Sequence, residues 1–463
     1  MNGGIHGDKT YVSRGGKRLD LSDRELASIF TEALSRALTD LGDPGPVLIL
    51  PPDGTRQHSR AGMLTDIACR ELEGSGKTAS LFGGAGSGWS LGAVMPALGT
   101  HTPMTSAEIR DMFPQTPPDK FLSHDWRRDV VELGRIEADW VAGISSGAVA
   151  YDWPVQVNRR IRDGGFSLVI SIGQVAPHEV VGMANHDKNI FVGIGGKEAI
   201  DKSHFLGAAY GMERIIGRVD TPVRALFDEG RRRFGNQLPP VLWVLTVVSL
   251  RNDTEAAAAG KARGSPAVRG LFVGFGRDCF ERAAALAQEV NVDIPDERIQ
   301  KAVVYLDPGE YRSTWLGNKA IYRTRMALED QGELLILAPG LQRFGEDPAL
   351  DRIIRKHGYR PGAVIKDRIS RDEGLAGNLS AAAHLIHGSA EGRFTVRYCP
   401  GPGLSRAEIE SVGYEWGNYS EAAARYDVQT LRFGWNTLPD GERIFFIVNP
   451  ALGLWIDGRR LIR

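Results

Sequence analysis

A group of histidines and a lysine follows the apolar run 166–172, which we expect to form a buried strand. The imidazole pKa, ordinarily about 6.5, suits proton transfer in both directions at neutral pH. Open α/β sheets usually bind ligands just past the carboxyl ends of their strands, so the stretch 177–207 is the first candidate site. Its polar members are His178, His186, Lys188 and His204.

Three other positions also combine a predicted strand end with reactive side chains. Asp53 and Arg56 follow the apolar run 47–50, His101 follows the run 93–99, and Lys319 lies in the second half of the chain. Any one of them alone is more often structural than functional. Loops at the carboxyl ends of parallel strands converge on one crevice, so together they predict a shared site.

The residue types in this set suit acid–base chemistry on a small anionic substrate. Two opposed histidines make an acid and base pair, and a third could hold a metal through its neutral imidazole. Arg56 offers a planar fork for a carboxylate and Lys319 a point charge. The alternatives are a surface ion pair between Arg56 and Asp53, which would contribute only about 0 to 1 kcal/mol, and a solvated helix position for Lys319.

Two further segments could bind a phosphate. The glycine loop 83–88 offers backbone amides, but it lacks the Lys-Ser or Lys-Thr of a P-loop, so a flexible turn is favoured. Arg159 and Arg160, after Asn158, could bind a phosphate or face water.

The elements that must position these residues follow a repeated order of strand, polar turn and helix. A helix begins near Ser22, with a capping box to Glu25, and another begins at Thr105. The repeat predicts a doubly wound parallel sheet. A stretch rich in alanine, glycine and proline, 251–270, resembles a hinge and is followed by a second α/β pattern.

The predicted fold is therefore two α/β domains with mainly parallel sheets and an active-site cleft between them. The N-terminal domain, 1–262, would carry the histidines. The C-terminal domain, 263–463, would contribute Lys319, and its last segment could pack back on the first domain.

The composition narrows the class of protein. The 463 residues carry 56 lysines and arginines against 57 aspartates and glutamates, a formal net charge of −1, which shows no nucleic-acid footprint. Three widely separated cysteines encode neither a disulfide framework nor a cysteine-based zinc site. Neither a leader-like N-terminus nor a long apolar segment stands out. We expect a soluble cytoplasmic protein that binds neither nucleic acid nor membrane.

Several motifs resemble those of the lactate racemase family, whose members use a nickel-pincer nucleotide. That family has an Asp-x-x-Arg turn, a Gly-Thr-His-Arg-Pro segment, an Asn-Arg pair and a Pro-His pair. In the family a lysine follows the last histidine by ten residues, and another histidine follows that lysine by sixteen. The matching residues here are Asp53, Arg56, His101 in Gly-Thr-His-Thr-Pro, Asn158, Arg159, His178, Lys188 and His204.

The chain departs from the family pattern at two places. The family's Gly-Phe-Ser-Gly-Gly-Arg-Lys is replaced by 182–188, Gly-Met-Ala-Asn-His-Asp-Lys, which makes Lys197 a fallback for the lysine. The family's Tyr-Gln-x-x-Lys is replaced by 315–319, Trp-Leu-Gly-Asn-Lys, which keeps the lysine and loses the glutamine. The sequence is thus similar to a divergent member with an altered, larger substrate such as a sugar acid or a dicarboxylic 2-hydroxy acid.

The resemblance implies a racemase or epimerase that inverts C2 of a 2-hydroxy acid by reversible hydride transfer. Lys188 would hold the pyridinium-derived cofactor through a thioamide, and His204 would bind its nickel. His101 and His178 would be the catalytic acid and base. Arg56 and Lys319 would bind the carboxylate, and Asp53, Asn158 and Arg159 would contact the cofactor. Maturation would require cofactor-synthesis enzymes.

Two other functions remain open at this point. A zinc or iron hydro-lyase acting on sugar acids could use His101, His178 and His204 as metal ligands. A non-catalytic sensor could bind a nucleotide or an organic acid on the same fold.

Overall fold

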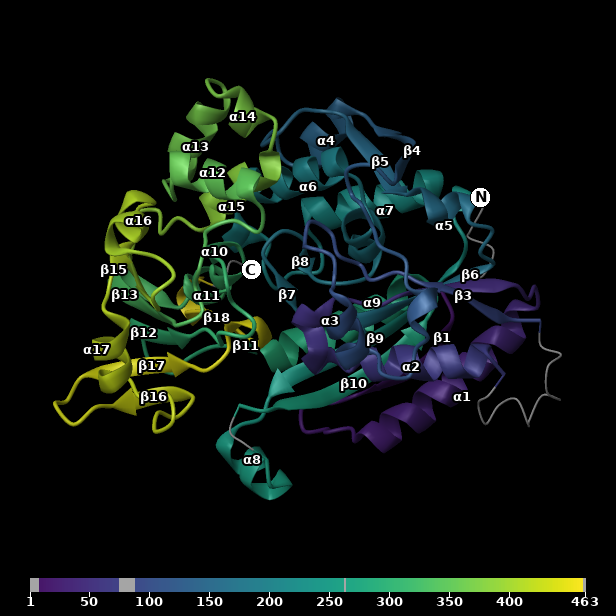
Figure 1. Cartoon of the computed structure of the whole chain (residues 1–463), viewed down its shortest axis with the longest axis horizontal. Helices are drawn as coiled ribbons and strands as arrows, with labels where there is room; N and C mark the ends of the chain where they lie inside the picture. The colour runs from purple at the N-terminus through teal and green to yellow at the C-terminus, as the bar shows by residue number, and fades with distance from the viewer. Residues whose placement is uncertain (1–7, 75–87, 262–263, 461–463) are drawn as a thin grey trace. The chain divides into compact units, whose positions relative to one another are not determined.

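The structure, a computed structural model, describes residues 8–74, 88–261 and 264–460 (Figure 1). The chain divides into two compact units. Unit 1 consists of Met1–Ser203, Arg218–Ser249 and Ala267–Val290, and unit 2 of His204–Gly217, Leu250–Pro266 and Asn291–Arg463. Each unit is built on its own sheet, as the two predicted α/β patterns require.

Among the described residues of unit 1, six strands form one sheet in the order β1-β10-β9-β6-β2-β3. The strands are β1 (Thr10–Gly15), β2 (Pro46–Leu50), β3 (Ser90–Val94), β6 (Leu168–Gln174), β9 (Val241–Leu250) and β10 (Pro266–Gly274). The pairs β2–β3, β2–β6 and β6–β9 are parallel, and β1–β10 is antiparallel. β6 is buried along its whole length, as expected for an interior parallel strand.

Smaller strands and the helices of unit 1 surround this sheet (Figure 1). The antiparallel pairs are β4 (Val130–Ile136) with β5 (Trp153–Asn158), and β7 (Pro177–His178) with β8 (Gly182–Met183). The helices are α1 (Asp23–Leu41), α2 (Ala61–Leu72), α3 (Ser106–Met112), α4 (Ala138–Ile144), α5 (Arg159–Asp163), α6 (Lys197–Tyr210), α7 (Pro222–Phe234) and α9 (Gly276–Asn291). α6 begins in unit 1, and its residues from His204 onward fall in unit 2.

Unit 2 contains a second sheet, in the order β15-β14-β13-β12-β17-β16, with parallel pairs except β16–β17. Its strands are β12 (Ile299–Tyr305), β13 (Leu328–Ala338), β14 (Thr395–Pro400), β15 (Glu415–Trp416), β16 (Gly434–Thr437) and β17 (Arg443–Ile447), with a separate pair β11 (Val292–Asp293) and β18 (Leu454–Trp455). Its helices are α8 (Asp253–Ala259), α10 (Thr314–Gly317), α11 (Lys319–Thr324), α12 (Pro348–His357), α13 (Gly362–Ile369), α14 (Glu373–Ala376), α15 (Leu379–His387), α16 (Arg406–Ser411) and α17 (Tyr419–Arg425).

The local signals in the sequence place several elements well. The predicted capping boxes form at Ser22 with Glu25 and at Thr105 with Glu108, where they begin α1 and α3. The strand predicted at 93–99 is found earlier, at Ser90–Val94. α11 ends at Thr324, and β13 begins at Leu328.

The described parts of the predicted hinge, 251–261 and 264–270, contain a helix and a strand, and the division of the chain differs from the predicted boundary after residue 262. An Asn252 capping box starts α8, and β10 then joins the sheet of unit 1 by pairing with β1. The apolar residues of β10 are buried there, which assigns Ala267–Val290 to unit 1. The cleft between domains stays a prediction.

No helix among the residues described, 8–74, 88–261 and 264–460, is both long enough and apolar enough to cross a bilayer.

Candidate functional site

Three neighbouring parallel strands of unit 1 deliver the predicted residues to one edge of the sheet. β2 leads to Asp53 and Arg56, β3 leads to His101, and β6 leads to His178. Hydrogen bonds continue the β2–β3 pairing past the strands, from Met95 N to Ile49 O and from Ala97 N to Pro51 O. These loops therefore leave the sheet together, as the strand-end argument predicts.

The Asp53 carboxylate and the His101 imidazole form a hydrogen-bonded pair. His101 Nδ1 lies 2.5 Å from Asp53 Oδ2, while Asp53 Oδ1 accepts hydrogen bonds from Thr55 N and Thr55 Oγ1. Burial alone would raise the pKa of Asp53, but the charge and hydrogen bond of His101, with the Thr55 hydroxyl, hold that pKa below its usual range. Asp53 is thus ionised at neutral pH and fixes the orientation of the His101 ring.

Arg56 is half-buried three residues after Asp53, in a short 3-10 segment (Gly54–Ser59). Its charge contributes to the low pKa of Asp53, but the Asp53 oxygens bond to His101 and Thr55. Within residues 8–74, 88–261 and 264–460, its guanidinium has no hydrogen-bond or ion-pair partner. A surface ion pair with Asp53 therefore does not hold the Arg56 guanidinium, which can bind an anion.

His178 is buried at the start of a tight antiparallel turn between β7 and β8. Its Nδ1 accepts a hydrogen bond of 3.1 Å from the backbone amide of Val180, and the nearest Glu179 oxygen is 4.0 Å away. The side chain is 11% exposed. The backbone of its own turn therefore orients this ring.

Lys188 stands at the entrance of a π-helix, Asn189–Gly193, and is half-buried. The Asn189 side chain donates to Ser171 Oγ of β6 and to Asn185 Oδ1, which ties the segment to the sheet. The amide of Gly99, two residues before His101, donates to Gly193 O at 2.8 Å. π-helical turns occur frequently at functional sites, and this one lies against the loop that carries His101.

The segment before Lys188 is held by arginines of α7. Arg224 is fully buried, and its guanidinium donates to Met183 O and Asn185 O, while Arg231 Nε donates to Asp187 Oδ1 at 2.8 Å. Asn185 and His186 both have positive φ, 74° and 57°. These contacts fix an unusual backbone where the sequence departs from the family motif.

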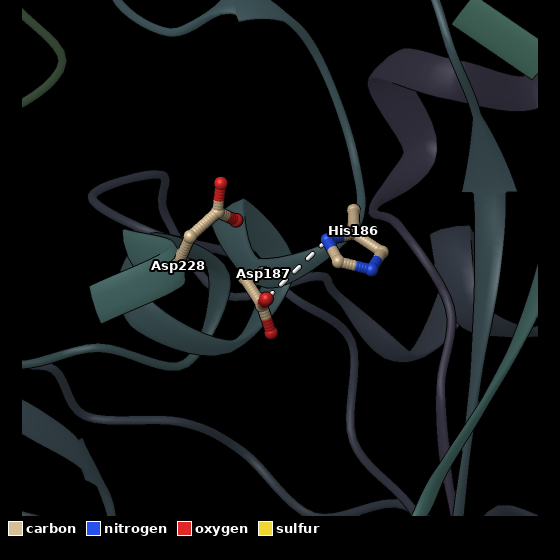
Figure 2. A group of neighbouring side chains, drawn as sticks. All are labelled: His186, Asp187 and Asp228. Carbon is tan, nitrogen blue, oxygen red and sulfur yellow. Dashed lines mark ion pairs between the residues drawn. The ribbon is translucent and has the colours of Figure 1, made fainter. Parts of the chain in front are cut away.

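His186, Asp187 and Asp228 form a compact group whose ligand-type atoms lie within 4.8 Å of one another (Figure 2). His186 Nδ1 is 3.3 Å from Asp187 Oδ2. Both carboxylates are already paired with guanidinium groups, Asp187 with Arg231 and Asp228 with Arg277. The group is a partly buried ion-pair network that holds the loop, so His186 is structural here.

Acid should destabilise the folded chain through His186. Burial lowers its pKa to about 4, from about 6.5 when unfolded, so the unfolded chain binds the proton first as the pH falls. The contribution of neutral His186 to the free energy of unfolding is therefore fully present above about pH 6.5. This contribution, about 3 kcal/mol, is lost as the pH falls from 6.5 to 4. The free energy of urea unfolding, measured at several pH values, should depend less on pH in this window for His186→Gln than for the wild type. Equal slopes would contradict this role.

Asn158 and Arg159 occupy structural positions. The Asn158 side chain caps α5 through Arg160 N and lies 2.9 Å from His124 Nδ1, while Arg159 is exposed on the surface. His124 also contacts Gly195 O at 3.0 Å, which links the end of β5 to the segment before α6. Their predicted cofactor contacts stay predictions.

The remaining predicted residues belong to unit 2. His204 is half-buried on α6, and Lys319 is half-buried at the start of α11, with Nζ 5.6 Å from the centre of the Tyr311 ring. Leu316, at the position of the family's glutamine, is buried in the core of unit 2. The Trp315 ring packs against the His384 ring at a tilt of 31°, and the hydroxyls of Tyr322 and Tyr359 lie within hydrogen-bond distance of the two nitrogens of His384.

The sequence indicated the residue types of the site but not the side chains with which they pair. The Asp53–His101 pair joins residues 48 positions apart, and the His384 network joins three helices; no local pattern signals either. For the Asp53–His101 pair, the one signal in the sequence was that each residue follows the end of a predicted strand, β2 or β3. The glycine loop 83–88 falls outside the described residues except for Gly88.

Residues 92–213 match the family model of the lactate racemase N-terminal domain, a segment that includes His101, His178, Lys188 and His204. No curated protein matches the chain.

Two solved structures share the fold. One is the crystal structure of a protein from Thermotoga maritima, which has 20% sequence identity to this chain and a TM-score of 0.72. The alignment covers 94% of this chain and 100% of the Thermotoga maritima chain. The other is the lactate racemase apoprotein from Thermoanaerobacterium thermosaccharolyticum, which has 14% sequence identity to this chain and a TM-score of 0.65. The alignment covers 97% of this chain and 100% of the apoprotein chain. The chain thus contains a segment similar to the lactate racemase N-terminal domain, and it shares an α/β fold with mainly parallel sheets with both solved structures.

Proposed function

We propose that this protein is a racemase or epimerase that inverts C2 of a 2-hydroxy acid. The observation that carries the proposal is the Asp53–His101 pair, an ionised carboxylate that orients an imidazole, with the charge of Arg56 acting on the same carboxylate. Such a pair can take a proton from a hydroxyl group, and the neighbouring guanidinium can hold the adjacent carboxylate. The family match over residues 92–213 supports an isomerase of this class.

The residues present fit a nickel-pincer nucleotide. Lys188 offers the amine for a thioamide link, and His204 offers a neutral imidazole, a suitable ligand for nickel. The fallback, Lys197, pairs through Nζ with Asp201 Oδ2 at 2.6 Å. The spacing of ten residues from His178 and sixteen to His204 is what favours Lys188 as the anchor. When bound, the group supplies acceptance and return of the C2 hydride.

The protein's own residues manage the oxygen and the carboxylate of the substrate. Arg56 binds the carboxylate and thereby fixes C2 and its hydroxyl, with Lys319 as the second predicted carboxylate partner. A histidine takes the hydroxyl proton as the alcohol becomes a ketone, and an imidazolium returns a proton to the oxygen. Inversion follows when the flat keto acid receives hydrogen on its other face.

Arg56→Lys should weaken substrate binding more than it slows turnover. Lysine keeps the positive charge but loses the two-pronged hydrogen-bond geometry, so KM for the 2-hydroxy acid should rise by about tenfold. Steady-state kinetics on both enantiomers measure this. Arg60→Lys is the matched control, because Arg60 is exposed and pairs with Asp23; an equal rise in KM for both variants would count against Arg56 as the carboxylate site.

The substrate we propose is larger than lactate, such as a sugar acid or a dicarboxylic 2-hydroxy acid. Leucine replaces the family's glutamine at Leu316, where it is buried in the core, so this position brings no polar side chain to a small substrate. The test is a panel of single-enantiomer 2-hydroxy acids incubated with nickel-loaded protein while optical purity is followed. Activity on lactate alone would overturn the larger substrate.

The hydro-lyase alternative has less support. His178 Nδ1 accepts a hydrogen bond from Val180 N, which places the proton of the neutral ring on Nε2 and leaves no free nitrogen lone pair for a metal. Within the described residues, neither His101 nor His178 belongs to a group of three close ligand-type side chains. A purified protein that carries zinc or iron and no adduct on Lys188 would favour that alternative.

A further inference from the structure

The two candidate catalytic histidines differ in the partner of the same ring atom. His101 Nδ1 faces the Asp53 carboxylate, which can only accept a hydrogen bond when ionised. His178 Nδ1 faces the backbone amide of Val180, which can only donate one. A neutral imidazole carries one proton, so these partners select opposite tautomers.

For His101 the proton belongs on Nδ1. The hydrogen bond to Asp53 Oδ2 needs an N–H, and the low pKa of Asp53 keeps the acceptor charged at neutral pH. The lone pair of the neutral ring is then on Nε2. His101 therefore presents a proton acceptor at its outer nitrogen, with a side chain that is 31% exposed.

For His178 the proton belongs on Nε2. A proton on Nδ1 would point at the Val180 N–H, and Val180 is buried, with 4% of its surface exposed. That buried amide would lose its acceptor, which is an unfavourable change. Glu179 does not compensate, because its oxygen is 4.0 Å from Nδ1, beyond hydrogen-bond distance.

We propose that the two histidines are not interchangeable: His101 is the proton acceptor of the resting enzyme, and neutral His178 donates a hydrogen bond through Nε2–H to the substrate oxygen. The proposal rests on the proposed function for its substrate, but the tautomers themselves do not. A hydroxyl placed at His101 meets a base, whereas one placed at His178 meets a donor. His101 Nε2 takes the proton from the hydroxyl oxygen while the hydride leaves C2. In the reverse step the proton returns to the oxygen and the hydride returns to C2.

The tautomers can be read directly by NMR on the full chain labelled with ¹⁵N-histidine, at a pH where both rings are neutral. Two-bond ¹H–¹⁵N correlations distinguish a protonated from an unprotonated ring nitrogen, and loss of a signal in His101→Gln and His178→Gln assigns each ring. If one of these variants fails to fold, His101→Asn or His178→Asn serves for the assignment. We expect Nδ1–H at His101 and Nε2–H at His178. Nδ1–H at His178, or a ring that averages both tautomers, would overturn the proposal.

A kinetic comparison tests the consequence. Glutamine places an N–H donor where Nε2–H of histidine stood but cannot act as a base. His101→Gln should lower the rate of C2 inversion by about 10²- to 10⁴-fold, and His178→Gln by about tenfold or less. Equal large losses would contradict the proposal. If the NMR result holds while no 2-hydroxy acid is inverted, the proposed function fails and the tautomer assignment stands.

Discussion

Replacing Asp53 with asparagine is expected to lower the rate of 2-hydroxy acid inversion by about 10²- to 10⁴-fold. The asparagine amide is nearly the same size as the carboxylate, but it is neutral and can donate a hydrogen bond to Nδ1. His101 would then carry its proton on Nε2, where the substrate hydroxyl needs an acceptor. The loss should appear mainly in kcat, because Asp53 bonds to His101 and Thr55.

Two controls separate this positioning role from damage to the fold. Thr55→Val removes the 2.6 Å hydrogen bond to Asp53 Oδ1 but keeps the carboxylate against His101, so its effect should be about tenfold or less. The His101 ring in Asp53→Asn should change its tautomer in the ¹⁵N spectrum while His178 keeps its own. A folded Asp53→Asn protein with unchanged kcat would refute the role of the pair.

The second large effect concerns Lys188. We expect Lys188→Arg to carry no covalent cofactor and to show no inversion activity, because a guanidinium keeps the charge but does not form the thioamide that an amine forms. Intact mass spectrometry of protein produced together with the cofactor-synthesis enzymes measures the adduct directly. The wild type should show the added mass of the nucleotide.

Lys197→Arg is the matched control for that experiment. Lys197 follows Lys188 by nine residues and pairs with Asp201 in the first turns of α6. Its arginine variant should keep the adduct. An adduct that survives in Lys188→Arg and disappears in Lys197→Arg would move the anchor to the fallback lysine.

The sequence predicted those parts of the fold that local patterns encode. The capping boxes at Ser22 and Thr105 and the apolar runs of β2 and β6 are short-range signals, and each was found near its predicted place. β10 was harder, because it lies between β9, which precedes it in the chain, and β1, which is more than 250 residues away. A glycine- and proline-containing stretch before it suggested a hinge, while the pairing that buries it could not be read locally.

The candidate site divides in the same way. The residue types at the strand ends could be predicted, since parallel neighbours place their carboxyl ends at one edge. The roles of Asp53 and His186 could not: Asp53, predicted to contact the cofactor, bonds to His101, and His186 is held in a buried network with Asp187. Both relations depend on side-chain partners that only the folded chain brings together.

The most direct test of the proposed function is the fate of the C2 hydrogen in D₂O. Protein that carries nickel and the Lys188 adduct is incubated with single-enantiomer 2-hydroxy acids, and optical purity and C2 deuterium are followed together. Hydride transfer returns the original hydrogen to C2, so the inverted product should still bear protium at C2. Inversion with deuterium at C2 would show proton abstraction instead, and unchanged optical purity across the panel would contradict the proposed function.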